Sequence, residues 1–225
     1  MSCSLKSPLL PLLVALTVTP LFADTWAPPR PRVFASEGGT FGFKVLEPKF
    51  LGTATGLLFD LDPDGEERTV WNGKLVNVPS RVRVSEDGKR VLTIDTYGKL
   101  GHEHALVVYD NQSKVLADYK LEDLLTPLEI KFLPTTVSSR AWTAYARFTF
   151  SPDRRHFVIT LNCSKLFREQ LQTAKEFLSM TSDPESQKHW RNRIEEAQSG
   201  LKEPGERVLK IELGSGKLEG EIENR

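Results

Sequence analysis

The chain has 225 residues, and its 30 Lys and Arg side chains are balanced by 30 Asp and Glu side chains, so the formal net charge at pH 7 is zero. A nucleic-acid-binding protein needs a basic surface to displace counterions from phosphates, so this balance argues against that class. The hydrophobic fraction of 39% and the charged fraction of 27% are typical of a globular domain and exclude wholesale disorder. The length allows one large domain or two small ones.

Residues 1–23 have the pattern of a secretory signal peptide. Lys6 is the only charged side chain before an apolar, proline-interrupted run over residues 8–22, and Ala23 precedes a plausible cleavage site at Asp24. The run is too short for a comfortable membrane-spanning helix, although an uncleaved anchor is the alternative. We therefore expect an exported protein, periplasmic or secreted, without stable membrane insertion.

Cleavage at this site would remove Cys3 and leave Cys163 as the only cysteine. A single cysteine cannot form an internal disulfide, so a hydrophobic core must stabilise the fold. Cys163 follows a predicted strand, where a buried and inert thiol is more usual than a nucleophile. Residues 24–31 are rich in proline and predict an extended linker in front of one domain over residues 32–225.

From residue 32 onward, the same order of short strands and turns recurs three times. The first copy predicts strands over residues 32–35, 41–45, 56–61 and 68–71. The second and clearest copy predicts strands over residues 81–84, 90–95, 105–109 and 115–120, with the turn Ser85-Glu86-Asp87-Gly88 after the first of them. The third copy predicts strands over residues 146–150, 156–161, 207–212 and 217–222. A four-stranded repeat of roughly 40–50 residues is the size of a propeller blade.

The third copy is interrupted by an insertion over about residues 164–200 that predicts two antiparallel helices. The first helix carries one apolar stripe, formed by Phe167, Leu171, Ala174 and Leu178. Asp183 and Pro184 are typical of the start of a helix, and Gly200 of its end. Residues 121–143 predict a second, irregular link that includes one helical turn.

The turns carry a family resemblance. Residues 84–92 (Val-Ser-Glu-Asp-Gly-Lys-Arg-Val-Leu) resemble the Ser-Pro-Asp-Gly turn of WD-repeat and TolB-like propellers, and residues 150–153 match that turn again. Tyr109-Asp110 is similar to the Trp-Asp pair that ends a strand in WD repeats. The chain as a whole also resembles uncharacterised exported bacterial proteins built around such blades. The resemblance implies a scaffold with an interaction role.

The expected fold class is mainly β, with three four-stranded antiparallel blade-like units, an open or incomplete propeller, and a two-helix insertion. A closed propeller usually has at least four blades. Three units could instead form an open stack capped by the helices, pair with a partner, or form a sandwich whose periodicity is coincidental.

One compact cluster carries metal-ligating residue types, in the segment Gly101-His102-Glu103-His104. In an extended segment His102 and His104 point to the same side, as a metal-binding pair requires. A metal site needs a third or fourth ligand, which Asp95 or Tyr97 on the same loop could supply. The alternative is a pair of solvated histidines at the end of the loop.

Other catalytic motifs fail on spacing. The chain has no Gly-x-Ser-x-Gly nucleophile elbow. Residues 214–217 lack the first glycine and the final Ser or Thr of a phosphate-binding loop, and the carboxylates of residues 60–64 lack the downstream Glu of a calcium loop. We therefore expect no catalytic residues and no cofactor.

These observations favour an exported, non-enzymatic scaffold that binds a protein or an extracellular ligand. The alternative is a metal-dependent or hydrolytic periplasmic enzyme that uses the loop of His102 and His104. Exposed sheet edges would also favour a homodimer.

Overall fold

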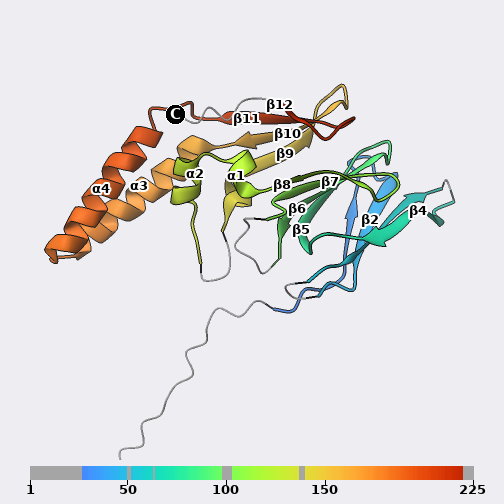
Figure 1. The fold of residues 1–225 in the computed structure, drawn as a ribbon, viewed down its shortest axis with the longest axis horizontal. Helices are drawn as coiled ribbons and strands as arrows, with labels where there is room; N and C mark the ends of the chain where they lie inside the picture. The colour runs from blue at the N-terminus through green and yellow to red at the C-terminus, as the bar shows by residue number, and fades with distance from the viewer. Residues whose placement is uncertain (1–26, 50–51, 63, 98–102, 137–139, 220–225) are drawn as a thin grey trace, which may run out of the picture.

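The computed structural model describes residues 27–49, 52–62, 64–97, 103–136 and 140–219. Over these residues the protein is mainly β, with three four-stranded antiparallel sheets and a few helices (Figure 1). Within each sheet the strands lie side by side in the order in which they follow along the chain. The predicted mainly β class, the three four-stranded units and the helical insertion are confirmed.

The strands have the following bounds. The first sheet contains β1 (Arg32–Ala35), β2 (Phe41–Leu46), β3 (Thr55–Leu61) and β4 (Glu67–Lys74). The second sheet contains β5 (Pro79–Val84), β6 (Arg90–Thr96), β7 (Leu106–Asp110) and β8 (Val115–Tyr119). The third sheet contains β9 (Ala146–Phe150), β10 (His156–Leu161), β11 (Arg207–Glu212) and β12 (Leu218–Glu219).

The largest difference from the predicted strands is at β4, which continues three residues beyond Trp71. Asn72 and Gly73 have the composition of a turn, yet they pair with Leu57 and Gly56 of β3. Pairing with a neighbouring strand therefore overrides the local preference of these residues. The predicted end of the last strand, at residues 220–222, lies outside the described residues.

The same side-chain hydrogen bonds build the first turn of the second and third sheets. The Ser85 hydroxyl donates to Asp87 Oδ1 at 2.7 Å and accepts from the Arg90 N–H at 2.9 Å. The corresponding Ser151 hydroxyl donates to Asp153 Oδ1 at 2.5 Å and accepts from the His156 N–H at 3.0 Å. The two turns therefore share one local structure, as their similar sequences predict.

The fourth residue of this turn has a left-handed backbone in all three sheets. Gly39 (φ 77°) and Gly88 (φ 64°) occupy it in the first and second sheets, and Arg154 (φ 58°) occupies it in the third. Glycine adopts this conformation freely, whereas an L side chain costs roughly 1–2 kcal/mol there. The third turn therefore retains a strained residue where the other two use glycine.

The second sheet is the middle layer of the molecule, and its central strands β6 and β7 are buried on both faces. On one side Val107 and Tyr109 of β7 pack with side chains of the first sheet, including Trp71. On the other side Leu106 and Val108 pack with the third sheet and the helices. A strand covered on both faces needs apolar residues at consecutive positions, which explains why the strand Leu-Val-Val-Tyr does not alternate.

The insertion folds into two long antiparallel helices, α3 (Cys163–Met180) and α4 (Pro184–Gly200), which extend away from the sheets (Figure 1). The Asp183 carboxylate caps α4 by accepting from the Ser186 N–H at 2.8 Å, as the sequence predicts. Gly200 is the last residue of α4, but its role is packing rather than a left-handed cap. A Cβ atom there would lie 2.6 Å from the ring of Phe167 on α3.

Residues 121–143 are more helical than the irregular link that the sequence predicts. They contain α1 (Leu121–Leu124), α2 (Pro127–Phe132) and the start of the 3-10 helix η1 (Trp142–Tyr145). Thr126 and Glu129 form a capping box at the start of α2, each side chain accepting from the other residue's N–H. The segment Thr-Pro-x-Glu is the signal that would have predicted this helix. No helix of the described ranges is long and apolar enough to cross a bilayer.

A buried ion pair joins α2 to β11, the strand that follows the insertion. Arg207 Nη2 lies 2.5 Å from Glu129 Oε2, and Arg207 Nε lies 3.1 Å from Oε1. Arg207 also donates to the Leu124 carbonyl at 2.7 Å, and the Cys163 thiol donates to Glu129 at 3.1 Å. Because Glu129 is only 5% exposed, loss of either charge would leave the other buried without a partner, at a cost of about 3–5 kcal/mol.

The glycine of the second-sheet turn gives a first testable prediction. A Cβ atom at Gly88 would lie 2.4 Å from the Phe41 ring, in addition to the strain of its positive φ. We expect Gly88→Ala to lower the free energy of unfolding by about 2 kcal/mol or more. Gly65→Ala is the matched control, because Gly65 also has a positive φ but has nothing within 4 Å of its Cβ position, so it should cost about 1 kcal/mol. Equal losses in urea denaturation would contradict the steric argument.

Candidate functional site

The loop between β6 and β7, where the sequence places its metal-ligand candidates, begins and ends at strained residues. Asp95 (φ 63°) lies near the end of β6, and His104 (φ 56°) lies two residues before β7. Non-glycine residues in this conformation cost roughly 1–3 kcal/mol each and persist where their surroundings fix them. Strain of this kind is concentrated at functional sites, so the loop is a candidate site on structural grounds too.

The His104 side chain is held by a carboxylate that the sequence analysis missed. His104 Nδ1 lies 2.7 Å from Asp118 Oδ2 on β8. The antiparallel pairing of Val107 with Asp118 brings this strand alongside the loop, so knowledge of the β7–β8 register could have found the contact. A carboxylate on one ring nitrogen orients the imidazole and leaves Nε2 as the nitrogen available to a ligand.

A buried amide fixes both ends of the loop. Asn77, which is 1% exposed, has its Nδ2 within 3.3 Å of the Asp95 carbonyl, the Thr96 hydroxyl and the His104 carbonyl. Its Oδ1 accepts from the Thr93 hydroxyl, also at 3.3 Å. Because buried polar groups need internal partners, this network couples the strained residues to the interior of the second sheet.

The Asp95 carboxyl lies in a largely apolar environment. Burial raises its pKa to about 6, although the Thr96 N–H (2.9 Å from Oδ1), the Ser80 hydroxyl and the charge of Arg81 act in the opposite direction. The indole of Trp142 also lowers this pKa slightly, but its buried Nε1 does not reach hydrogen-bond geometry. Trp142 is fully buried, so it belongs to the core rather than to a ligand surface.

The predicted metal pair is only partly within the described residues. His104 is described, whereas His102 lies outside the described residues. No group of three or more His, Cys, Asp or Glu side chains is placed to hold a metal ion within the part of the chain that the structure describes. The metal-binding hypothesis for His102 and His104 therefore stays a prediction.

Cys163 has the properties of a structural thiol. It is 6% exposed, and burial together with the Glu129 carboxylate raises the pKa of its thiol to about 12. A thiol with such a pKa is protonated at neutral pH, whereas the nucleophile is the thiolate. The expectation of a buried cysteine is confirmed, and the direction of its pKa is that of an inert thiol.

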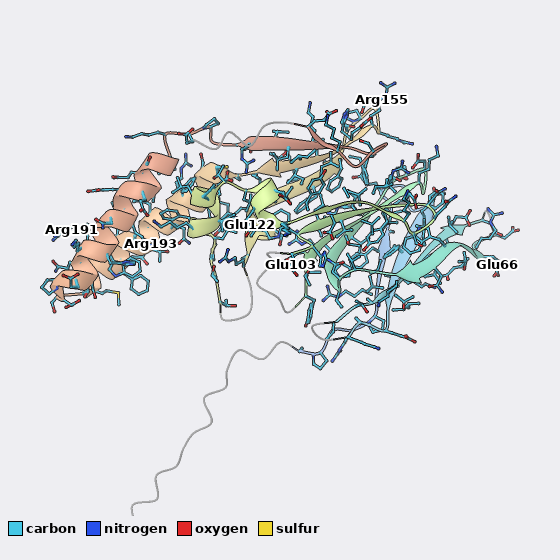
Figure 2. All side chains as sticks on the ribbon, viewed as in Figure 1. Glu66, Glu103, Glu122, Arg155, Arg191 and Arg193 are labelled. Carbon is cyan, nitrogen blue, oxygen red and sulfur yellow. The ribbon has the colours of Figure 1, made fainter. Side chains whose placement is uncertain are left out.

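The distal part of the α3–α4 pair presents apolar side chains to solvent. The rings of Phe177 and Trp190 stack at 4.8 Å between centroids with an interplanar angle of 11°. Phe177 is nevertheless 46% exposed, and Met180 at the end of α3 is 78% exposed. Figure 2 shows this part of the helix pair, with Arg191 labelled, far from the sheets. We call the α3–α4 helix pair the arm, and Phe177, Met180 and Trp190 the arm tip.

Comparison with known proteins gives no assignment. No protein-family model matches the chain, and no curated protein matches it. Functional inference therefore rests on the residues themselves.

The pKa of Asp95 predicts how stability depends on pH. A carboxyl whose pKa is raised from about 4 to about 6 binds its proton more tightly in the folded state, so the free energy of unfolding falls as pH rises through that window. We expect a loss of about 2–3 kcal/mol between pH 4 and pH 6. Asp95→Asn should lack this loss and be more stable than the wild type at pH 7, because a neutral amide can still accept from Thr96.

Asp183→Asn is the matched control for this measurement. The pKa of Asp183 is lowered by its hydrogen bonds to Ser186, so its contribution to stability is lost only below the window. This variant should keep the dependence between pH 4 and pH 6 in urea denaturation. A pH profile of Asp95→Asn identical to that of the wild type would contradict the assignment.

Proposed function

We propose that the protein is an exported, non-enzymatic scaffold that binds a partner protein through the arm tip. In this proposal the three sheets are consecutive blades of an open, incomplete propeller. The identical strand order in each sheet and the shared Ser–Asp turn support that arrangement. The sheets supply rigidity, and the helix pair supplies specificity.

The observation that carries the proposal is the exposure of the arm tip. Contact between apolar side chains and water is unfavourable in free energy. Exposed apolar patches on a protein surface therefore often mark interaction sites. Met180 has a large, flexible side chain and Phe177 a large, flat one, and protein interfaces favour both kinds. The base of the arm, in contrast, packs against the body of the protein. The rings of Phe167 and Phe132 of α2 meet edge-on with 5.5 Å between their centroids.

Export is part of the proposal and rests on residues 1–23. The state of Cys163 fits it, because a buried thiol with a raised pKa resists oxidation in a compartment where exposed thiols do not persist. A homodimer through exposed sheet edges remains a further prediction of the open arrangement.

Site-specific photo-crosslinking tests the arm tip. A benzophenone amino acid replaces Met180 in the full chain, expressed in its native host. We expect one discrete adduct, and its yield should fall several-fold when Phe177→Ala is added. The control places the same amino acid at Arg68, which is exposed on β4 of the first sheet. Equal or absent labelling at the two positions would contradict the proposal.

A second candidate function is a metal-dependent or hydrolytic enzyme at the β6–β7 loop. The contact between His104 and Asp118 favours it, since carboxylates commonly orient metal-binding histidines. Metal analysis of protein purified without chelator distinguishes the two candidates. A stoichiometric metal that is lost in His104→Ala would support the enzyme, and metal-free protein would exclude its metal-dependent form.

A further inference from the structure

A groove of about 510 Å³ lies between the first hairpins of the second and third sheets. The β5–β6 hairpin contributes Lys89 and Arg90, and the β9–β10 hairpin contributes Arg154 and Arg155. Figure 2 shows Arg155 beside the hairpins of the sheets, far from Arg191 on the helix pair. The groove is therefore separate from the partner surface proposed above.

Arg90 forms a fixed part of the wall. Its Nε donates to the Leu213 carbonyl, its Nη1 to the Lys89 carbonyl at 2.7 Å, and its Nη2 to the Gly214 carbonyl at 3.4 Å. These bonds link the second sheet to the loop after β11 and hold the guanidinium in place. All three acceptors are neutral backbone groups, and no ion pair with another described residue cancels the positive charge of Arg90.

The two carboxylates of the groove are already engaged. Asp87 accepts from the Ser85 hydroxyl at 2.7 Å and the Lys89 N–H at 3.1 Å, and it lies 3.5 Å from Lys89 Nζ. Glu212 accepts from the Ser215 hydroxyl at 2.5 Å. The groove thus combines four cationic side chains with two carboxylates, in a chain whose total charges balance.

Arg154 carries a second, independent sign of function. It has the left-handed backbone (φ 58°) for which the equivalent turns use Gly39 and Gly88. Among the described residues no ion pair is formed by Arg154, and Arg155 meets Asp153 through its backbone N–H at 3.1 Å and through the attraction of its charge. The Arg154 N–H closes the turn on the Ser151 carbonyl at 2.8 Å, which glycine would do equally well, so the turn itself gives no reason for an arginine at this position. Arg154 thereby adds a guanidinium to the lining of the groove.

We propose that this groove binds an oligophosphate, a ligand with two or more linked phosphate groups. Guanidinium groups bind phosphate oxygens in pairs, and the groove is lined by Arg154 and Arg155 in addition to the fixed charge of Arg90, so it can engage more than one phosphate group. The volume lies in the range of small-molecule sites. The lining includes His156 but no Phe, Tyr or Trp, so it offers no large aromatic surface for a nucleobase. Recognition is therefore through the phosphates.

Isothermal titration of the purified protein with tripolyphosphate, at low salt and neutral pH, tests the proposal. We expect binding by the wild type and a roughly tenfold larger Kd for Arg155→Gln, because one charge-assisted pair of hydrogen bonds to phosphate is lost. Arg154→Gly should weaken binding similarly, yet raise the melting temperature of the ligand-free protein by about 2–4 °C, because the backbone strain is relieved. Arg168→Gln, an exposed arginine on α3, is the matched control and should bind within twofold of the wild type.

The same measurements can overturn the proposal. Absence of binding at millimolar tripolyphosphate would refute the site. An equal loss in Arg168→Gln would show attraction to the whole surface rather than to the groove. Citrate binding as tightly as tripolyphosphate would refute the phosphate chemistry, and a lower melting temperature for Arg154→Gly would refute the strain argument.

Discussion

The rest of the structure depends on the burial of the two central strands of the second sheet, β6 and β7, on both of their faces. Side chains of β6 and β7 alternate between two hydrophobic clusters, one shared with the first sheet and one shared with the third sheet and the helices. A sheet in this position has no solvent to satisfy its polar groups. The Thr93 hydroxyl therefore donates to Asn77, and Asn77 donates to the backbone at the end of the sheet. The strained β6–β7 loop is a consequence of the same enclosure, since the buried amide dictates where its ends lie.

Much of the β structure could be predicted from the sequence because its determinants are local. Alternating strands and Ser–Asp turns are encoded within a few residues, so β1, β9, β10 and β11 have their predicted bounds. The extension of β4 could not be predicted, because the partner strand and not composition decides it. Helix α2 is different, since its capping box of Thr126 and Glu129 is a local signal that the sequence does carry.

The candidate sites were harder to predict because they join residues that are far apart in the chain. The residue type of His104 makes it a candidate in the sequence, but its partner Asp118 is found only through the pairing of β7 with β8. The ion pair between Glu129 and Arg207 spans the whole insertion, so no spacing rule indicates it. The basic groove forms only when turns of two sheets meet, and its arginines look like ordinary surface residues in the sequence.

The helical insertion has a consequence for how the third sheet assembles. Leu161 of β10 pairs with Arg207 of β11, although the whole helix pair lies between them. The Ser164 N–H donates to the Gly205 carbonyl at 3.0 Å, so the two ends of the insertion meet each other as well as the sheet. Once the helices form, the two ends of the insertion are close together. The entropic cost of closing this long connection is then similar to that of a short loop. The arm thus behaves as a module, and its outer turns could lengthen or shorten without changing the register of the strands that carry it.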